Sequence, residues 1–311
     1  MSTLDDPRSA RRTAAPGTGP HPAAGGFRAF TVRRPITALL LLVIPPGWAI
    51  LGVPALAAHG VIPGGDLPVE VFALALTVLV MLPATTWVVR VTEGRAGVRA
   101  LFSRTFRWRF GVAWWATVLI ALPLTTVVVG VALGDSLATA DLPATLAREV
   151  PLMLLPIVLV NMWEETAWAG FVQTRLDRRH GLLAAAALTA VAFAGIHLPM
   201  LLADEDVSVS SFLAGAGLLL GAGLVVRVMV GVFLRATAGS VLAVAVLHAS
   251  WNGSTGEGGV ADDLLSGGQP LLAALIAAAL VTAAAVALAG RRVTRGSADG
   301  TARPAPSTAG V

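Results

Sequence analysis

The chain has 311 residues, of which 56% are hydrophobic and 13% are charged, and its formal net charge is +4. Its mean hydropathy is +0.78, which is typical of membrane proteins and excludes an ordinary soluble domain. We therefore predict an all-α fold, a polytopic bundle of transmembrane helices.

The first segment, residues 1–34, is rich in Arg, Ala, Gly and Pro. Such a composition cannot bury enough apolar surface to fold, so we expect a disordered cytoplasmic leader. The apolar run that follows is too long for a cleavable secretory signal. Residues 293–311 have a similar composition and predict a disordered cytoplasmic tail.

Residues 35–292 form one predicted transmembrane domain. Apolar runs recur along it, and each is long enough, or nearly so, for a hydrocarbon core that requires about 20 residues. They predict about eight spans, of which the seventh is short. The spans are 36–58, 69–90, 111–134, 151–173, 182–202, 212–234, 237–252 and 271–290.

The charges between the spans alternate in sign. All 22 Lys+Arg residues are Arg, and they gather in alternate gaps, whereas the other gaps are acidic or nearly neutral. Arg148, beside Glu149, is the exception. Under the positive-inside rule this pattern predicts a multi-pass protein of the cell membrane with both termini in the cytoplasm. Arginines at the lipid headgroups explain the net charge, so we expect no nucleic-acid partner.

Few strongly polar side chains lie inside the predicted spans. A charge at mid-membrane costs a few kcal/mol, so such residues usually line a pocket or a path. Two of them are adjacent, in the segment VNMWEETAWAGF that begins at Val160. The set is Glu164, Glu165, His197, Arg227, His248 and Asn252.

The spacing of these residues indicates a hydrolytic site. His248 and Asn252 are four residues apart and share one helix face. Glu164 and Glu165 point about 100° apart, so only one can face a common centre. With His197, three helices offer one carboxylate, two imidazoles and one amide. These groups can activate water, hold it, and donate hydrogen bonds to an oxyanion.

The predicted span limits place these residues at different depths. At about 1.5 Å per residue, Glu164 falls near mid-membrane, whereas His197 and His248 fall in the outer half. Helix tilt or a broken helix would be needed to bring them level. The face from which substrate approaches stays open.

Three motifs carry a family resemblance. They are EETAWAG from Glu164, FAGIH ending at His197, and HASWN starting at His248. In this order, each in its own predicted helix, they resemble the CPBP family of intramembrane proteases. That family includes the CAAX prenyl endopeptidases and bacterial relatives described as Abi or bacteriocin-processing proteins. The resemblance covers about residues 150–255.

The resemblance implies a role for each motif residue. Glu164 would be the general base that activates water, and His197 would hold that water. His248 and Asn252 would donate hydrogen bonds to the tetrahedral oxyanion. Glu165 would support the site or bind a metal.

The resemblance leaves the cofactor undecided between none and a divalent metal such as zinc. Family members are described as metalloproteases, and Glu164, His197 and His248 would make an acceptable zinc set. A mechanism with glutamate and water alone uses the same residues. The sequence has no HExxH motif, and it has no cysteine for a thiolate ligand.

One position departs from the family pattern. The first motif normally carries Arg four residues after the second glutamate, and here that residue is Ala169. Glu165 must therefore find another cation, be protonated or contact water. Arg227, on the sixth predicted span, is a possible replacement.

The leading hypothesis is an endopeptidase that cleaves membrane-embedded or lipid-anchored peptides inside the bilayer. Ala169 favours the alternative, a catalytically impaired pseudoprotease acting as a membrane scaffold or a bacteriocin self-immunity factor. A transporter or proton relay is disfavoured, because the chain shows no repeated halves. The Lys-free, Ala- and Arg-rich composition suggests a bacterial source, in which prenylated CAAX substrates are not expected. The oligomeric state is not readable from the sequence.

Overall fold

The structure is a computed structural model that describes residues 26–138, 141–204, 206–255, 259–266 and 270–290. It is an all-helical bundle, apart from one pair of two-residue strands. The first elements are α1 (Phe27–Arg33), α2 (Pro35–Ala58), α3 (Val69–Ala75), η1 (Leu76–Met81), α4 (Leu82–Thr105), α5 (Val112–Ala116), η2 (Thr117–Ala121), α6 (Leu122–Ala132) and β1 (Ser136–Leu137). The next are α7 (Leu142–Pro156), η3 (Ile157–Asn161), α8 (Met162–Ala167), η4 (Trp168–Gln173), α9 (Thr174–His180), α10 (Leu182–His197) and η5 (Leu198–Leu202). The last are α11 (Val209–Ala236), α12 (Val241–Thr255), α13 (Val260–Leu264), β2 (Leu265–Ser266) and α14 (Pro270–Ala289).

Seven continuous helical segments of the described chain are long and apolar enough to cross a membrane. Many of their outward-facing side chains are large and apolar, as in Leu79, Leu183 and Leu288, which suits lipid contact. The segments are Pro35–Ala58, Val69–Thr105, Val112–Ala132, Leu142–His180, Leu182–Leu202, Val209–Ala236 and Pro270–Ala289. The prediction of a polytopic helical bundle is confirmed.

The predicted seventh span, 237–252, corresponds to α12, which is shorter than the others at 15 residues. From Val241 to Trp251 every side chain of α12 except that of Leu242 is buried. The helix packs against α6, α8, α11 and α14. A helix surrounded by protein does not have to match the bilayer thickness. α12 is thus the centre of the bundle.

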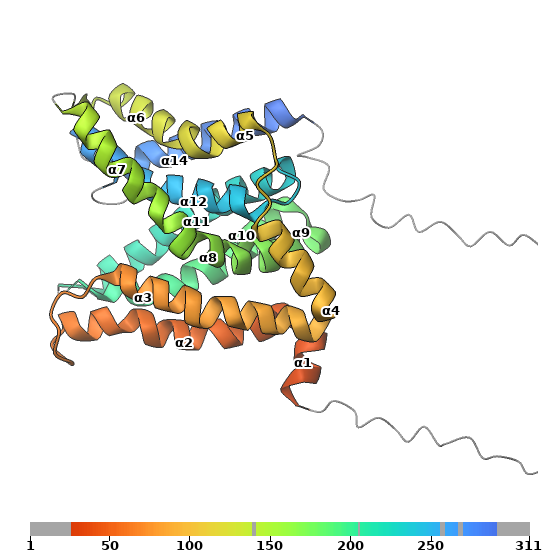
Figure 1. Ribbon diagram of the computed structural model, residues 1–311. Helices are drawn as coiled ribbons and strands as arrows, with labels where there is room; N and C mark the ends of the chain where they lie inside the picture. Colours follow the sequence, from red (N-terminus) through yellow and green to blue (C-terminus); the bar gives the residue numbers. More distant parts are fainter. Residues whose placement is uncertain (1–25, 139–140, 205, 256–258, 267–269, 291–311) are drawn as a thin grey trace, which may run out of the picture.

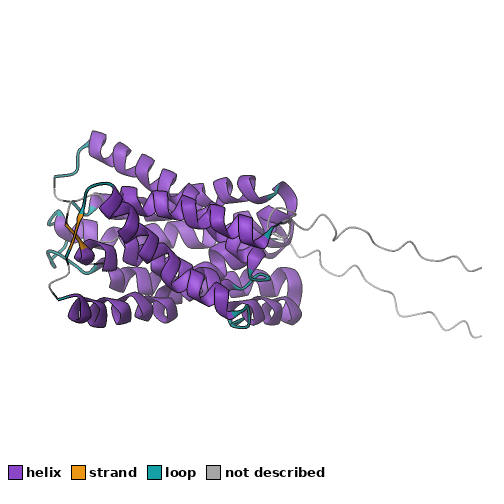
Figure 2. Cartoon of the chain, turned by 90° about the horizontal axis from the view of Figure 1, so that it is seen from above, coloured by secondary structure: helices purple, strands orange, loops and turns teal. Residues whose placement is uncertain are grey.

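The other helices are arranged around this centre. Figure 1 shows α2 beside the α3–α4 helix on one flank and α6 beside α14 on the other, with α8 and α12 between them. The strands β1 and β2 pair through Ser136 with Ser266 and Leu137 with Leu265. Figure 2 shows this strand pair at one end of the bundle.

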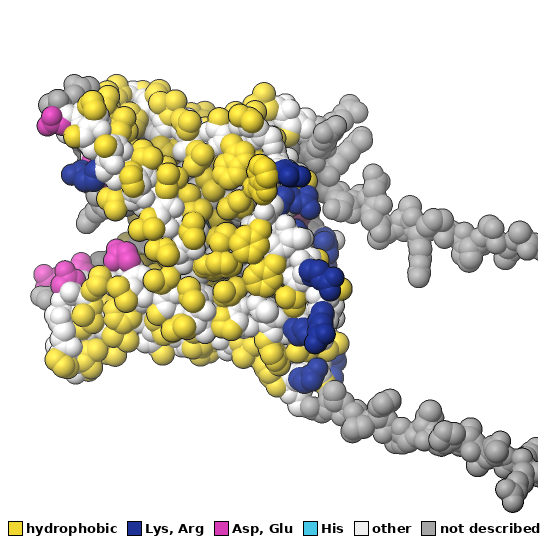
Figure 3. Space-filling model, viewed as in Figure 1, with side chains coloured by type: hydrophobic (Ala, Val, Ile, Leu, Met, Phe, Trp, Pro, Cys, Tyr) yellow, Lys and Arg dark blue, Asp and Glu magenta, His cyan; other side chains and the backbone are white. Residues whose placement is uncertain are grey.

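The two ends of the bundle carry opposite charges. Figure 3 shows arginines at the end where α1 and α9 lie in Figure 1, and most acidic side chains at the opposite end. The basic end comprises Arg28, Arg33, Arg34, Arg90, Arg95, Arg99, Arg104, Arg107, Arg109, Arg175, Arg178, Arg179 and Arg235. The acidic end comprises Asp66, Asp135, Asp141, Asp204, Asp206, Asp262 and Asp263.

Arg148, the exception to the charge alternation, lies in α7 and is paired locally. Its Nε donates to Glu149 at 2.5 Å, and its Nη2 donates to Asp263 of α13. Two carboxylates therefore balance this arginine, which explains why it interrupts the charge pattern without an excess of positive charge.

The predicted leader contains a helix. α1 covers Phe27–Arg33, where the ring centre of Phe27 lies 5.8 Å from that of Trp87 in α4. The expectation of disorder is therefore wrong for this segment, because its aromatic residues find a surface to pack against. Residues 1–25 of the leader and the predicted tail 293–311 lie outside the described residues.

The candidate glutamates lie in α8, between two π-helical turns. η1, η2, η3 and η4 are π-helical, whereas η5 is a 3₁₀ turn. A π turn holds more residues than an α turn, so it changes the direction of the side chains that follow, and such turns are frequent at functional sites. η3 therefore changes the direction of the α8 side chains, and η4 changes that of the α9 side chains.

Candidate active site

Glu165 is the most enclosed of the candidate residues. Its carboxylate accepts two hydrogen bonds from Arg227 of α11, from Nη1 to Oε2 and from Nη2 to Oε1, both 2.8 Å long. Neither side chain is exposed. Nδ1 of His248 in α12 donates to the same Oε1 at 2.8 Å. One carboxylate therefore joins α8, α11 and α12.

Arg227 supplies the positive charge that Ala169 lacks. The sequence named Arg227 as a possible partner of Glu165, and the structure confirms this ion pair. Ala169 is completely buried in the apolar cluster that α11 and α12 share. A bidentate arginine–carboxylate pair satisfies both oxygens, so Glu165 is a compensated buried charge.

The position of Arg227 depends on close contact between η4 and α11. Nε2 of Gln173 donates to the carbonyl oxygen of Arg227 at 2.6 Å. At Gly231, one turn further along α11, an added Cβ would lie 2.8 Å from Nε2 of Gln173 and 2.4 Å from Cδ1 of Leu182. The guanidinium carbon also lies 4.2 Å from the ring centre of Phe193. Glycine at position 231 therefore lets α11 approach closely enough for its arginine to reach the site.

Glu164 is the accessible carboxylate. Its side chain is 10% exposed, whereas that of Glu165 is fully enclosed. Oε1 of Glu164 lies 3.8 Å from Nε2 of His197, and Oε2 lies 3.8 Å from Nδ1 of His248. These separations exceed a direct hydrogen bond and leave room for a water that bonds to Glu164 and His197 together.

The hydrogen bonds of His197 fix its tautomer. Its Nδ1 lies 2.7 Å from the carbonyl oxygen of Phe193. A carbonyl oxygen only accepts hydrogen bonds, so Nδ1 carries the proton. In the neutral ring Nε2 is then a lone pair beside Glu164. The two side chains present neighbouring acceptors on the accessible side of the site.

The predicted difference in depth between Glu164 and His197 is absent from the structure. The helix that contains Glu164 continues to His180, seven residues beyond the predicted span limit. Gly181, with a φ of 78°, then turns the chain into α10. Glu164 lies 17 residues before this glycine, and His197 lies 16 residues after it. The two arms of this helical hairpin therefore bring both side chains to the same level.

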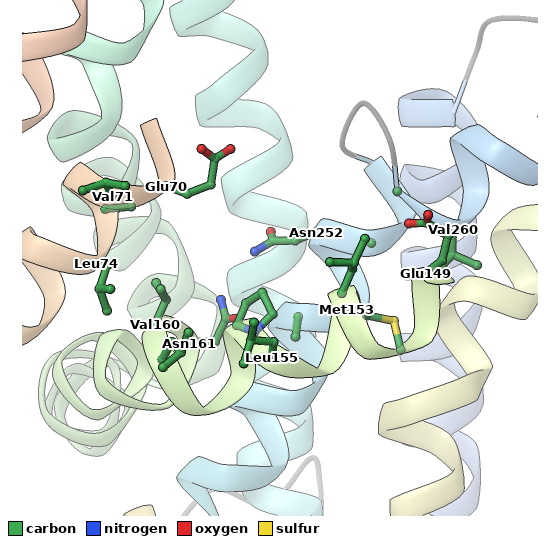
Figure 4. Close-up of a pocket in the computed structure, with 17 residues that line it drawn as sticks. Glu70, Val71, Leu74, Glu149, Met153, Leu155, Val160, Asn161, Asn252 and Val260 are labelled. Carbon is green, nitrogen blue, oxygen red and sulfur yellow. The ribbon is translucent and has the colours of Figure 1, made fainter. Parts of the chain in front are cut away.

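Asn252 lies apart from the ion-paired cluster. It follows His248 by one turn of α12, it is exposed, and its side chain forms no hydrogen bond to any described residue. It lines a cavity of about 610 Å³ whose walls come from α3, α7, η3 and α12 (Figure 4). This volume is in the range of small-molecule and peptide pockets.

Two buried amides were missed in the sequence. Asn161 lies one turn before Glu164 and lines the same cavity as Asn252. Gln173 lies at the end of η4 and contacts Arg227. Both are amides inside the predicted fourth span, so their polarity was the signal in the sequence that could have identified them as candidate site residues.

The residues named for a metal do not form a ligand set. Among the described residues, no group of three or more His, Asp or Glu side chains is placed to hold a metal ion. The nitrogen of His248 that lies 3.8 Å from Glu164 is Nδ1, and this atom is hydrogen-bonded to Glu165.

Comparison with known proteins gives one match. Residues 146–254 match the family model described as type II CAAX prenyl endopeptidase Rce1-like. No curated protein and no solved structure matches the chain. The matched residues include all three motifs, so the resemblance inferred from them is confirmed. With its seven apolar helices, the chain is a multi-pass membrane protein.

Proposed function

We propose that the protein is an intramembrane endopeptidase, because residues 146–254 match the Rce1-like family model of CAAX prenyl endopeptidases. It hydrolyses peptide bonds of membrane-associated or hydrophobic peptides with a water molecule that Glu164 activates. The observation that carries the proposal is the separation of 3.8 Å between two acceptors, Oε1 of Glu164 and Nε2 of His197.

A water placed between these acceptors donates one O–H to each of them. The lone pairs of its oxygen then point toward the accessible side of the site, where they can attack a peptide carbonyl carbon. As the new C–O bond forms, Glu164 takes the water proton as the general base. Such base catalysis contributes about 10²- to 10⁴-fold.

His248 and Asn252 are the proposed donors to the oxyanion. Because Nδ1 of His248 bonds to Glu165, only Nε2 can face a substrate, and it donates a hydrogen bond there when it carries a proton. The Glu165 carboxylate orients the ring. When the tetrahedral intermediate collapses, the proton held by Glu164 passes to the leaving amine.

The alternative function is a catalytically impaired protein that acts as a membrane scaffold or a bacteriocin self-immunity factor. It is motivated by the missing motif arginine at Ala169. The Arg227–Glu165 pair supplies an equivalent positive charge from another helix, which favours the active enzyme.

The charge distribution supports a location in the cell membrane with the basic end in the cytoplasm. The described chain starts with α1 and finishes with α14 at this end (Figure 1), which is consistent with two cytoplasmic termini. The proposed partners are the lipid bilayer and a membrane-embedded or lipid-anchored peptide substrate.

The test compares new protein N-termini in membranes of cells that express the wild-type chain or the Glu164→Gln variant at equal levels. Cleavage products that depend on Glu164 are expected to disappear in the variant. Glu93→Gln makes the same chemical change in α4 at the basic end, and it should leave these products in place. Identical profiles for the wild type and Glu164→Gln, in a host where deletion of the gene has an effect, would favour the scaffold.

A further inference from the structure

The cavity beside the candidate site contains a buried polar atom without a partner. Asn161 is only 1% exposed, and its Oδ1 forms no hydrogen bond with the described residues. Figure 4 shows Asn161 and Asn252 among the side chains that surround this cavity. Buried polar atoms are nearly always paired, so an unpaired one needs an explanation. Because Asn161 also lines the cavity, a rotation of its amide would let a bound ligand pair with this atom.

The chemistry of the cavity wall fits an extended peptide. Most of the lining is apolar, with Leu152, Leu155, Leu159 and Val160 along α7 and η3. A peptide main chain in such surroundings loses water from its N–H and C=O groups and requires other partners. An asparagine amide both donates and accepts hydrogen bonds. The side chain of Asn161 can therefore pair with a peptide main chain while the apolar wall contacts the side chains of the peptide.

The rim of the cavity carries one uncompensated negative charge among the described residues. Two carboxylates line the cavity, those of Glu70 and Glu149. Arg148 binds Glu149 at 2.5 Å and balances it. Glu70, in the first turn of α3, is exposed and forms no ion pair with the described residues. A substrate with a positive charge next to its apolar residues complements this rim.

Two residues that line the cavity are close in sequence to the proposed catalytic residues. Asn161 precedes Glu164 by three residues, and Asn252 follows His248 by four, so each is about one helical turn from its neighbour. A peptide main chain held by Asn161 is therefore about one helical turn from Glu164.

We propose that this cavity binds the apolar residues on one side of the scissile bond, with Asn161 holding the substrate main chain and Glu70 selecting a cationic residue at the rim. This proposal rests on the proposed endopeptidase function and specifies its substrate class. The substrate is a stretch of apolar peptide flanked by lysine, arginine or a free amino terminus.

Binding is measured with the full-length Glu164→Gln protein, which keeps the cavity without turnover. The probe is a fluorescent peptide of Leu, Val and Ala residues with one Lys. Its binding to the protein in lipid nanodiscs is measured by fluorescence anisotropy. Adding Asn161→Leu, which keeps the size and removes the amide, should weaken binding about tenfold. Adding Leu155→Trp should also weaken binding by filling the cavity, and the fold should tolerate it because Leu155 is 57% exposed.

Two matched controls accompany these variants. Leu154→Trp changes the neighbouring residue, which does not line the cavity, and should leave the Kd unchanged. Glu70→Gln should reduce the preference for the Lys peptide over its Gln analogue about twofold to fivefold. Asp66→Asn, in the loop before α3, should not change this preference.

The outcomes separate this proposal from the proposed function. If Asn161→Leu and Leu155→Trp weaken binding but the wild type never cleaves, the endopeptidase function fails and the binding site stands. If the wild type cleaves the peptide and both variants keep its KM, the binding site is wrong and the function stands. The site is also wrong if the Glu164→Gln protein does not bind the peptide.

Discussion

The two adjacent glutamates differ in accessibility, and this difference separates their roles. Glu164 is partly exposed and lies near two imidazoles without a direct hydrogen bond to either. Glu165 is fully buried and forms hydrogen bonds with Arg227 and His248. In the proposed mechanism, Glu164 therefore contacts substrate and water, whereas Glu165 links α8 to α11 and α12.

Glu164→Gln is expected to reduce peptide hydrolysis about 10²- to 10⁴-fold, because the amide cannot accept the water proton. The fold should survive, because the substitution removes no direct hydrogen bond. The unfolding temperature in detergent, followed by the fluorescence of the eight tryptophans, should change by no more than a few degrees. A large drop in this temperature would mean that Glu164 has a structural role.

Arg227→Met is expected to destabilise the protein by about 3–5 kcal/mol, because it leaves a buried carboxylate without its cation. The double variant Arg227→Met/Glu165→Gln removes both charges and should recover much of this loss. The free energy of unfolding, measured with a chemical denaturant in detergent, gives both values. Equal losses in the single and double variants would show that the ion pair contributes little.

Most of the polar residues of the candidate site could be predicted from the sequence. The motif residues and Arg227 were recognised because charged and imidazole side chains stand out in apolar spans. Asn161 was not predicted as a site residue, because an uncharged amide is a weaker signal in an apolar span than the two glutamates that follow it. Its importance depends on the cavity and on its missing hydrogen bond, and both are properties of the folded chain.

At the element scale, the site depends on how closely α11 packs against its neighbours. Gly231 is in tight contact with Leu182 and Gln173, whereas Gly221, on the same helix, has no atom within 4 Å of an added Cβ. The two glycines therefore offer a matched pair, one at the contact that positions Arg227 and one in open space.

Gly231→Ala is expected to destabilise the protein by about 1–3 kcal/mol through overpacking, and to reduce activity by displacing Arg227. Gly221→Ala should be neutral or stabilising by up to about 1 kcal/mol, because alanine favours the helix. Unfolding temperature and peptide hydrolysis, measured on both variants, give the comparison. Similar effects at the two positions would contradict the role given to the α11 contact.

The length and hydropathy of the apolar runs were sufficient to predict most of the helices, but not their relative positions. A rule based on bilayer thickness ends the fourth span at residue 173 and cannot detect that its helix continues to His180. That continuation explains why Glu164 and His197 meet. The same rule predicts α12 as a short span, but it cannot show that this helix packs mainly against protein rather than lipid.

At the scale of the whole molecule, the bundle has a basic end and an acidic end (Figure 3). The positive-inside rule assigns the basic end to the cytoplasm. The lining of the cavity includes Glu70 and Gly259, close to the loops of the acidic end. This orientation would therefore admit substrate from the non-cytoplasmic face.

Single cysteines can test this orientation, because the chain contains no native cysteine. Asp66→Cys at the acidic end should react with a membrane-impermeant maleimide in intact cells. Arg179→Cys at the basic end should react only after the membrane is permeabilised. The reverse labelling pattern would invert the topology and move the substrate side to the cytoplasm.

The partners of Glu165 are encoded far downstream of it in the sequence. Arg227 is translated 62 residues after Glu165, and His248 is translated 83 residues after it. At about 5–20 residues per second, the ribosome supplies these partners several seconds after the glutamates. Until α11 and α12 are inserted, the nascent chain has neither the cation nor the proposed oxyanion donor. If the proposed function holds, the site therefore cannot cleave peptides before α12 is in place.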